Sequence, residues 1–258
     1  MKYVLLLTAC IQPSDENLKK NNIQRSDPII RLEDYQKALH YWLNEFKGPL
    51  HGIVFVENSG YSLESLKEIA FKFNKHNIAT EFLQQLASPL KQGLHYGYSE
   101  LELIDYAFEK SELISECDYV IKTTGRLYFT KLGNLIKKLP LNYDIAIDIK
   151  DYKIFNKEKH YANTTIFLVK KDFYLKELLN AKRLMAPINK QAHIEKIYFN
   201  ILKDFLNSKS YKVLLRFPFT MHPTGFGAHW NFDYSSPKKI LISYLRDISR
   251  VIFPKLWI

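Results

Sequence analysis

The chain has 258 residues, of which 47% are hydrophobic and 25% charged, so it can bury the core of a globular α/β fold and is not a disordered polyelectrolyte. Its formal net charge of +10 favours a polyanionic partner, which could be nucleic acid, an anionic membrane surface or a phosphorylated substrate. Two cysteines, Cys10 and Cys117, exclude a disulfide framework and a cysteine-rich metal site, and no apolar run approaches the roughly 20 residues of a membrane span.

The first half of the chain alternates apolar runs with amphipathic segments. The run 3–9 ends in Leu7-Thr8-Ala9-Cys10, which imitates a lipoprotein cleavage site, but it is short for a signal peptide and predicts a buried strand instead. Ser99 and Glu102 have the spacing of a capping box and predict the start of a helix. The pattern predicts a doubly wound, mostly parallel sheet, with strands near 3–9, 53–56, 80–83 and 119–121 and helices near 35–46, 63–73 and 99–108.

The second half is less regular. Strands are predicted near 145–149, 164–169 and 211–217, and a strongly amphipathic helix near 194–206. Because no repeat or low-complexity linker divides the chain, we expect one domain over 1–258. Its parts would be a nucleotide-binding half (1–130), an acceptor and catalytic half (131–237) and a basic, apolar tail (238–258).

Polar residues follow the apolar run 119–121. Lys122 and Arg126 flank two threonines and Gly125, where ligands gather in a parallel sheet, so the two cations are predicted to face a shared anion. The alternative is a turn whose cations reach solvent. The chain has no Gly-x-Gly-x-x-Gly, P-loop or Gly-x-Ser-x-Gly motif, which argues against a dinucleotide fold, a P-loop ATPase and an α/β-hydrolase.

A family resemblance rests on several of these segments. They are Arg25-Ser26-Asp27-Pro28 with Arg31 and Tyr35, then Val56-Glu57-Asn58-Ser59-Gly60, Gly97 with Glu100, and Lys122-Thr123-Thr124-Gly125-Arg126. Together they resemble bacterial glycosyltransferases of capsular-polysaccharide and lipopolysaccharide gene clusters, over roughly residues 1–130. The resemblance implies a GT-A-like fold that transfers a sugar from a nucleotide diphosphate, UDP in our expectation, to a glycan or lipid-linked acceptor. It also implies a cytoplasmic enzyme at the inner membrane.

The expected site residues come from these segments, from the helix near 194–206 and from the loop 222–230, whose glycines beside His and Trp suit contact with a diphosphate or a sugar; a wide surface turn is the alternative for that loop. Glu195, at the start of the amphipathic helix, is the expected general base of an inverting transfer; the alternative is an acidic residue that stabilises the helix N-terminus. The donor or acceptor sugar is expected to contact Glu100, His222, His229 and Trp230. The nucleotide and diphosphate are expected to contact Thr8, Ala9, Cys10, Arg25, Asp27, Arg31, Glu57, Asn58, Ser59, Lys122, Thr124, Gly125 and Arg126.

A metal is not expected. A GT-A enzyme of the standard type ends this strand on Asp-x-Asp, whereas here Lys122 stands where the second acid would be. Fixed cations can neutralise a leaving diphosphate in place of Mn²⁺ or Mg²⁺. A divalent metal held by Asp144, Asp148 and Asp151 is the alternative to this prediction.

The tail alternates cations with apolar bulk, which is typical of an interfacial helix and predicts contact with the inner-membrane surface; a core helix is the alternative. Two other functions compete with glycosyl transfer. One is a basic nucleic-acid-binding module, which the scattered cations and the lack of a nucleic-acid motif disfavour, so we expect no nucleic-acid partner. The other is a nucleotide-sugar-binding homologue that has lost catalysis.

Overall fold

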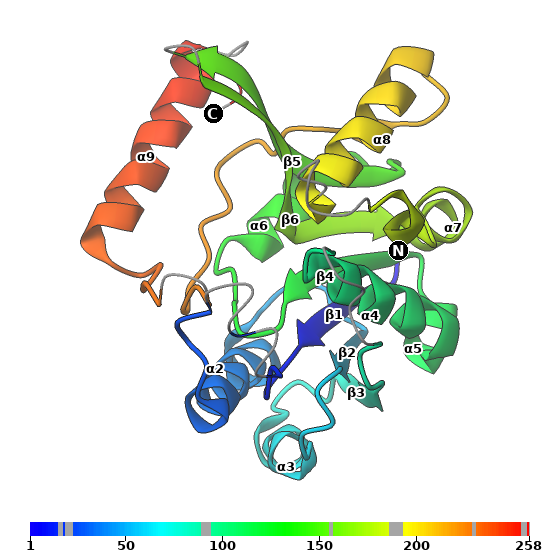
Figure 1. Ribbon diagram of the computed structural model, residues 1–258, viewed down its shortest axis with the longest axis vertical. Coiled ribbons are helices and arrows are strands. Elements are labelled where there is room, and N and C mark those ends of the chain that lie inside the picture. Colours follow the sequence, from blue (N-terminus) through cyan, green and yellow to red (C-terminus); the bar gives the residue numbers. More distant parts are fainter. Residues whose placement is uncertain are drawn as a thin grey trace.

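The computed structural model describes residues 1–14, 18, 23–88, 94–154, 157–185, 193–228, 231–253 and 257. Their centre is one seven-stranded sheet in the order β3-β2-β1-β4-β6-β5-β7 (Figure 1). β6 runs antiparallel to both of its neighbours, whereas the other pairs are parallel. The strands are β1 (Tyr3–Ala9), β2 (Gly52–Glu57), β3 (Ala79–Gln84), β4 (Tyr119–Thr124), β5 (Ile145–Ile154), β6 (Lys157–Lys170) and β7 (Val213–Leu214).

Helices cover both faces of the sheet because the buried strands are apolar on both faces. Along β1, Val4 and Leu6 pack into one core and Leu5 and Leu7 into the other. The first core is covered by α4 (Gly97–Lys110), α5 (Glu112–Ser115), α7 (Lys171–Phe173), the π-helical η2 (Tyr174–Leu178), the 3₁₀ turn η3 (Ala181–Leu184) and α8 (Ile194–Ser208). The second is covered by α2 (Pro28–His40), the π-helical η1 (Tyr41–Glu45), α3 (Glu64–Phe73) and α6 (Leu132–Lys138). The predicted α/β class, with a mostly parallel sheet flanked by helices, is confirmed.

Three local predictions need correction. Ser99 does not cap a helix: α4 begins at Gly97, and the Glu102 carboxylate accepts hydrogen bonds from the Ser88 backbone N (3.1 Å) and hydroxyl (2.7 Å). The predicted strand 211–217 is reduced to β7, because only Val213 and Leu214 pair with β5. β5 and β6 extend beyond the predicted ranges into a long hairpin.

The last helix, α9 (Pro237–Ile252), lies along the outside of the molecule, with Ser243 as its one buried residue (Figure 1). The prediction of a helix in the tail is confirmed, and the alternative of a core helix is wrong. Among the described residues, no helix is both long enough and apolar enough to cross a membrane.

Candidate functional site

A cavity of about 970 Å³ opens at the carboxyl ends of β1, β2 and β4. Thr8 of β1 lies level with Val56 of β2 and Thr124 of β4, so the residues that follow the three strands meet at one edge of the sheet. In open α/β sheets this edge is where ligands bind. Of the predicted site residues, the cavity is lined by Thr8, Ala9, Cys10, Arg31, Asn58, Ser59, Glu100, Thr124, Arg126 and Glu195.

Glu57 lies at this edge but does not face the cavity. Its side chain is fully buried, and Oε1 accepts hydrogen bonds from the backbone N of Ile11 (3.1 Å) and of Ser59 (2.8 Å). Oε2 accepts from Gly60 N (3.0 Å) and Gln84 Nε2 (3.2 Å). The prediction that Glu57 contacts the nucleotide is therefore corrected: its carboxylate is saturated by loop backbone and fixes the ends of β1 and β2.

Asn58 and Ser99 present buried polar atoms at the cavity. Asn58 is 8% exposed and Ser99 9%, and both line the cavity. Neither the Asn58 Oδ1 nor the Ser99 Oγ has a hydrogen-bond partner among the described residues. A buried polar group without a partner costs about 1–3 kcal/mol, which a polar ligand can recover. Asn58 was predicted for this site, whereas Ser99 was missed because its spacing resembled a helix cap.

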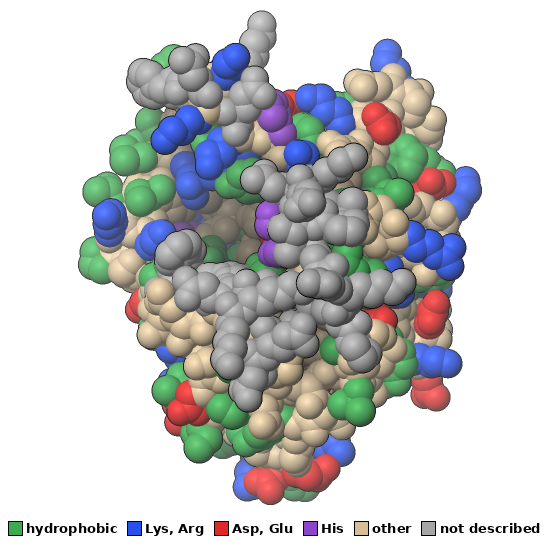
Figure 2. Space-filling model, in the orientation of Figure 1, with side chains coloured by type: hydrophobic (Ala, Val, Ile, Leu, Met, Phe, Trp, Pro, Cys, Tyr) green, Lys and Arg blue, Asp and Glu red, His purple; other side chains and the backbone are tan. Residues whose placement is uncertain are grey.

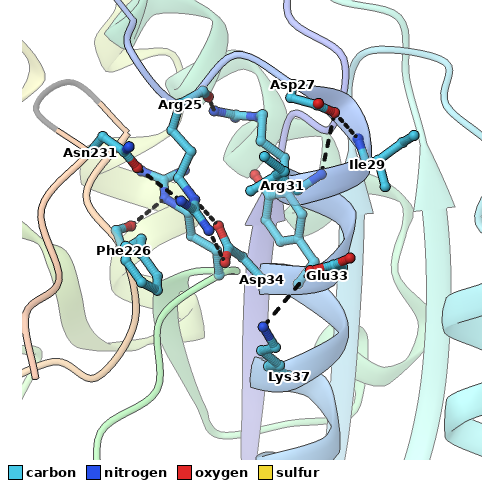
Figure 3. Close-up of polar contacts among 12 residues, drawn as sticks. Arg25, Asp27, Ile29, Arg31, Glu33, Asp34, Lys37, Phe226 and Asn231 are labelled. Carbon is cyan, nitrogen blue, oxygen red and sulfur yellow. Dashed lines mark hydrogen bonds and ion pairs between the residues drawn. The ribbon is translucent and has the colours of Figure 1, made fainter.

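Arg25 and Asp27 build the wall of the site. The Arg25 guanidinium forms a bidentate pair with Asp34 (Nε–Oδ2 2.5 Å, Nη2–Oδ1 2.7 Å) and donates to Asn231 Oδ1 at 2.8 Å (Figure 3). It also stacks 4.1 Å above the Phe226 ring. Asp27 caps α2, since its carboxylate accepts from Ile29 N at 2.8 Å. Arg25 thus links α2 to Phe226 and Asn231, whereas Asp27 only caps the helix. Neither residue lines the cavity, so their predicted nucleotide contacts are corrected to a structural role.

Arg31 connects this wall to the end of β1. It is 3% exposed, and its Nε donates to the Cys10 carbonyl at 2.9 Å while its Nη1 donates to the Arg25 carbonyl at 3.0 Å. The Cys10 thiol beside it has its pKa raised to about 11 by burial, against the lowering effects of Arg31 and Arg126. Cys10 is therefore a neutral thiol at neutral pH and not a nucleophile.

Lys122 does not reach the cavity. It is fully buried, and its ammonium donates to the Thr164 carbonyl at 2.8 Å and forms an ion pair with the Glu100 carboxylate. The strand pleat explains this, because Lys122 shares the face of Val120 and therefore points towards α4, which carries Glu100. The prediction of a direct phosphate contact by Lys122 is corrected: it holds Glu100, which does line the cavity.

Arg126 keeps donors available at the cavity. Its Nε donates to the Phe226 carbonyl at 3.0 Å, and its other two nitrogens have no hydrogen-bond partner among the described residues. Burial raises the pKa of Cys10, Tyr96 and Tyr234, all of which line the cavity, and the Arg126 charge opposes each rise. Arg126 also borders a smaller hollow of about 530 Å³ on the side of α2. Of the two predicted cations, Arg126 is the one that lines the cavity.

Gly125 is explained by packing. Its backbone N donates to the Thr8 carbonyl at 2.8 Å, and a Cβ atom at this position would lie 2.8 Å from that same oxygen. Any side chain would therefore push β1 and the turn after β4 apart. The glycine permits the close approach that brings Thr8 and Arg126 to one cavity.

Glu195 is the second carboxylate of the cavity. It is half-buried in the first turn of α8, and burial raises its pKa, with the Glu100 charge adding to the rise and Lys122 opposing it. A carboxyl whose pKa is raised towards neutrality is a better proton acceptor than an ordinary one. Glu100, Lys122 and Glu195 thus form one charge cluster, although they lie on α4, β4 and α8.

The remaining wall is aromatic, and sequence reasoning missed most of it. Tyr96, Tyr161, Phe232 and Tyr234 line the cavity. Burial raises the pKa of the three tyrosines, so their hydroxyls stay protonated and can donate hydrogen bonds. His222, predicted to contact sugar, does not line the cavity, and its Nε2 lies 2.8 Å from the Tyr234 carbonyl, which fixes this wall. His229 and Trp230 lie outside the described residues.

The carboxylates that the structure describes do not converge as ligands of a chelated divalent cation would. Among the described residues no group of three or more His, Cys, Asp or Glu side chains converges on one point. The acids that line the cavity are Glu100, which is already paired with Lys122, and Glu195. The alternative metal site of Asp144, Asp148 and Asp151 is not formed either, because each carboxylate has its own partner. Asp144 accepts a hydrogen bond from Lys212 N (2.8 Å), Asp148 pairs with Arg250 (3.0 Å) and Asp151 pairs with Lys203 (2.6 Å).

Comparisons with known proteins find similarity at the level of structure. No family model and no curated protein matches the chain. The inositol-1-phosphate CTP transferase of T. maritima aligns with a TM-score of 0.49 and 12% identity over 96% of each chain. The glycosyltransferase GlyE of Streptococcus pneumoniae TIGR4 aligns with a TM-score of 0.45 and 10% identity, over 83% of this chain and 45% of that one.

A third similar structure is the mannosyltransferase PcManGT of Pyrobaculum calidifontis, solved with GDP-Man and Mn²⁺. It aligns with a TM-score of 0.44 and 9% identity, over 83% of this chain and 54% of that one. The chain therefore spans about half the length of each of these two glycosyltransferases. At such scores and identities the function has to be argued from the cavity itself.

Proposed function

We propose that the protein is a glycosyltransferase that moves a sugar from a nucleotide-diphosphate donor to a hydroxyl acceptor. The proposal rests on the observation that Arg126 and Glu195 both line one cavity at the carboxyl edge of the parallel strands. One offers free cationic donors, and the other is a half-buried carboxylate with a raised pKa. Glycosyl transfer needs both: charge stabilisation for the leaving diphosphate and a base for the acceptor.

The donor is proposed to lie along the ends of β1, β2 and β4. Arg126 would grip the diphosphate with its two unpaired nitrogens, because a guanidinium binds phosphate oxygens bidentately. Asn58 and Ser99 would satisfy their buried polar atoms on the donor. As the bond between the anomeric carbon and the diphosphate breaks, negative charge grows on the leaving oxygen, and Arg126 stabilises it there.

Glu195 is proposed to be the general base of an inverting transfer. Its carboxylate takes the proton of the acceptor hydroxyl as the hydroxyl oxygen forms its bond to the anomeric carbon. Lys122 acts indirectly: it holds Glu100 at the cavity, and its positive charge limits the rise in the Glu195 pKa. The tyrosine hydroxyls are proposed to bind the sugars.

The wider role proposed is surface-polysaccharide synthesis, which follows the resemblance of residues 1–130 to capsular and lipopolysaccharide glycosyltransferases. A UDP-linked donor, a glycan or lipid-linked acceptor and a cytoplasmic site at the inner membrane belong to the same proposal. Residues 1–130 would bind the donor and 131–237 would contribute the acceptor side, which agrees with the positions of Arg126 and Glu195 in the chain.

A thermal-shift screen tests the donor proposal. UDP, GDP, CMP and TDP, each with and without Mn²⁺, should include at least one nucleotide that raises the Tm, since a ligand stabilises the state that it binds. The shift should be lost in Arg126→Ala and kept in Arg183→Ala, an exposed arginine that does not line the cavity. No shift with any nucleotide, together with tight binding of an oligonucleotide, would favour the nucleic-acid alternative.

Turnover tests the chemistry. A panel of nucleotide sugars should show release of a nucleoside diphosphate, slowly to water and faster with a glycan acceptor. Binding without any turnover would indicate a homologue that has lost catalysis. Release of pyrophosphate from a nucleoside triphosphate and a sugar phosphate would indicate nucleotidyl transfer and overturn the proposal.

A further inference from the structure

α9 is amphipathic, but its apolar side faces outwards and its polar side faces the protein, which is the opposite of an ordinary surface helix. At about 100° per residue, Leu241, Leu245 and Ile248 lie on one stripe, and they point away from the protein: their exposed fractions are 59%, 55% and 54%. The exposed apolar residues of α9 and of the position that follows it are Ile240, Leu241, Tyr244, Leu245, Ile248, Val251, Ile252 and Phe253. Figure 2 shows such hydrophobic side chains over α9, interspersed with Lys and Arg.

The opposite, polar side of α9 attaches the helix to the protein. Arg250 pairs with Asp148 and donates to the Phe217 carbonyl at 2.8 Å. Asp247 accepts from Thr220 N at 2.5 Å and lies 3.6 Å from Lys131. Since charged contacts hold α9 in place, its orientation is set, and the apolar stripe cannot turn inwards without breaking them.

Cations surround the apolar stripe. Within 237–252 the helix has four cations and one acid, of which Arg250 and Asp247 are engaged on the inner side. Lys238, Lys239 and Arg246 have no ion-pair partner among the described residues, although Lys239 lies over the Phe232 ring. Lys131 lies 5.9 Å from the ring centroid of Tyr244, which belongs to the stripe.

We propose that the outer face of α9 docks on an anionic lipid bilayer, with its apolar stripe among the acyl chains near the headgroups and its cations against lipid phosphates. Apolar side chains bordered by Lys and Arg are the composition that lies in a bilayer interface. A second copy of the chain is disfavoured as the occupant, because it would bring the same cations and a net charge of +10 to the contact. The proposal assigns the inner-membrane contact proposed above to one surface of the chain, and it does not depend on glycosyl transfer.

The docking face lies beside the proposed site. Arg246 affects the pKa of Lys150 and of Tyr161, so it is near both, and Tyr161 lines the cavity. Lys150 pairs with Tyr161 in the β5–β6 ladder, and its ammonium lies 5.4 Å from that ring. Figure 2 shows Lys and Arg along the rim of a hollow on the side of α9. A bilayer under α9 would therefore lie next to the Tyr161 side of the cavity.

Vesicle co-sedimentation of the full chain tests the proposal. Vesicles of phosphatidylcholine with 30% phosphatidylglycerol should bind the protein about tenfold or more tightly than pure phosphatidylcholine vesicles, and 0.5 M NaCl should remove most of that difference by screening. A Leu245→Glu/Val251→Glu variant should bind the anionic vesicles about tenfold or more weakly. Phe71→Glu, on α3 and 90% exposed, is the matched control that should bind like the wild type.

Other outcomes overturn the proposal. Equal sedimentation of the α9 variant and the wild type would remove α9 as the docking face. Binding only in the absence of anionic lipid, or none at all, would exclude an anionic surface. Light scattering that shows a wild-type dimer and a monomeric α9 variant would identify a second copy as the occupant. Because Leu245 and Val251 do not line the cavity, nucleotide thermal shifts in the same samples report the donor site independently.

Discussion

Replacing Lys122 by Met tests whether this lysine is a buried structural charge or a phosphate ligand. Methionine keeps the length of the side chain and removes the ammonium, which pairs with Glu100 and donates to the Thr164 carbonyl at 2.8 Å. Breaking a buried ion pair costs about 3–5 kcal/mol because it leaves the partner uncompensated. Since the Glu100 side chain keeps 23% exposure and water can solvate it, we expect the lower end, about 3 kcal/mol.

Urea denaturation measures the loss in the free energy of unfolding. In thermal unfolding the Tm should fall by about 6–12 °C, given about 2–4 °C per kcal/mol for a chain of this size. Lys67→Met is the matched control, because Lys67 pairs with Glu64 at 2.7 Å but with both side chains at least half exposed. It should cost about 0.5 kcal/mol or less. If folding of Lys122→Met were as stable as that of Lys67→Met, the structural role of Lys122 would be wrong.

A double-mutant cycle with Glu100→Gln refines the test. Glu100→Gln leaves a fully buried ammonium without a counter-charge, so it should destabilise the fold at least as much as Lys122→Met. The double variant should recover about 1–3 kcal/mol relative to the sum of the single losses, as directly paired groups do. Strict additivity would mean that the two side chains do not interact.

The remaining predictions concern the cavity. Arg126→Ala should lower turnover by about 10²-fold with an intact fold, because one preorganised charge stabiliser is lost; steady-state kinetics with near-normal turnover would contradict its role at the diphosphate. Glu195→Gln should abolish transfer and keep the nucleotide thermal shift; a fully active variant would move the base elsewhere. Because burial raises the Glu195 pKa and the base must be deprotonated, wild-type activity should rise with pH through that raised value. The same carboxyl contributes stability that is present at low pH and lost as pH rises through its folded pKa, so Glu195→Gln should flatten the profile of stability against pH. The Cys10 thiol, with its pKa of about 11, should react slowly with iodoacetamide at pH 8. Because Cys10 lines the cavity, a bound nucleotide should slow the reaction further. Labelling as fast as that of a free thiol, measured by mass spectrometry, would contradict the buried position of Cys10.

The sequence by itself determined the order of the elements and the edge at which the site lies. Apolar runs such as 3–9 predict buried strands, because a strand with apolar side chains on both faces is stable only when both faces are covered. Parallel strands end at a common edge, so polar residues after β1, β2 and β4 had to meet, and Asn58 and Arg126 were found in this way. Glu195 was found because helix periodicity located the start of α8.

The tertiary structure alone decided the roles of the charged residues. From the sequence, a charged residue at a strand end looks the same whether it faces a ligand or another side chain. In the fold, the strand pleat and the placement of α4 direct Lys122 towards Glu100. Glu57 and Arg25 likewise found partners that are distant in the chain, Ile11 and Asn231. Hydrophobic periodicity shows that α9 has an apolar side but not which side meets the protein. That was decided by Asp148, 102 positions from Arg250 in the chain, because its ion pair holds the polar side inward and leaves the apolar side exposed.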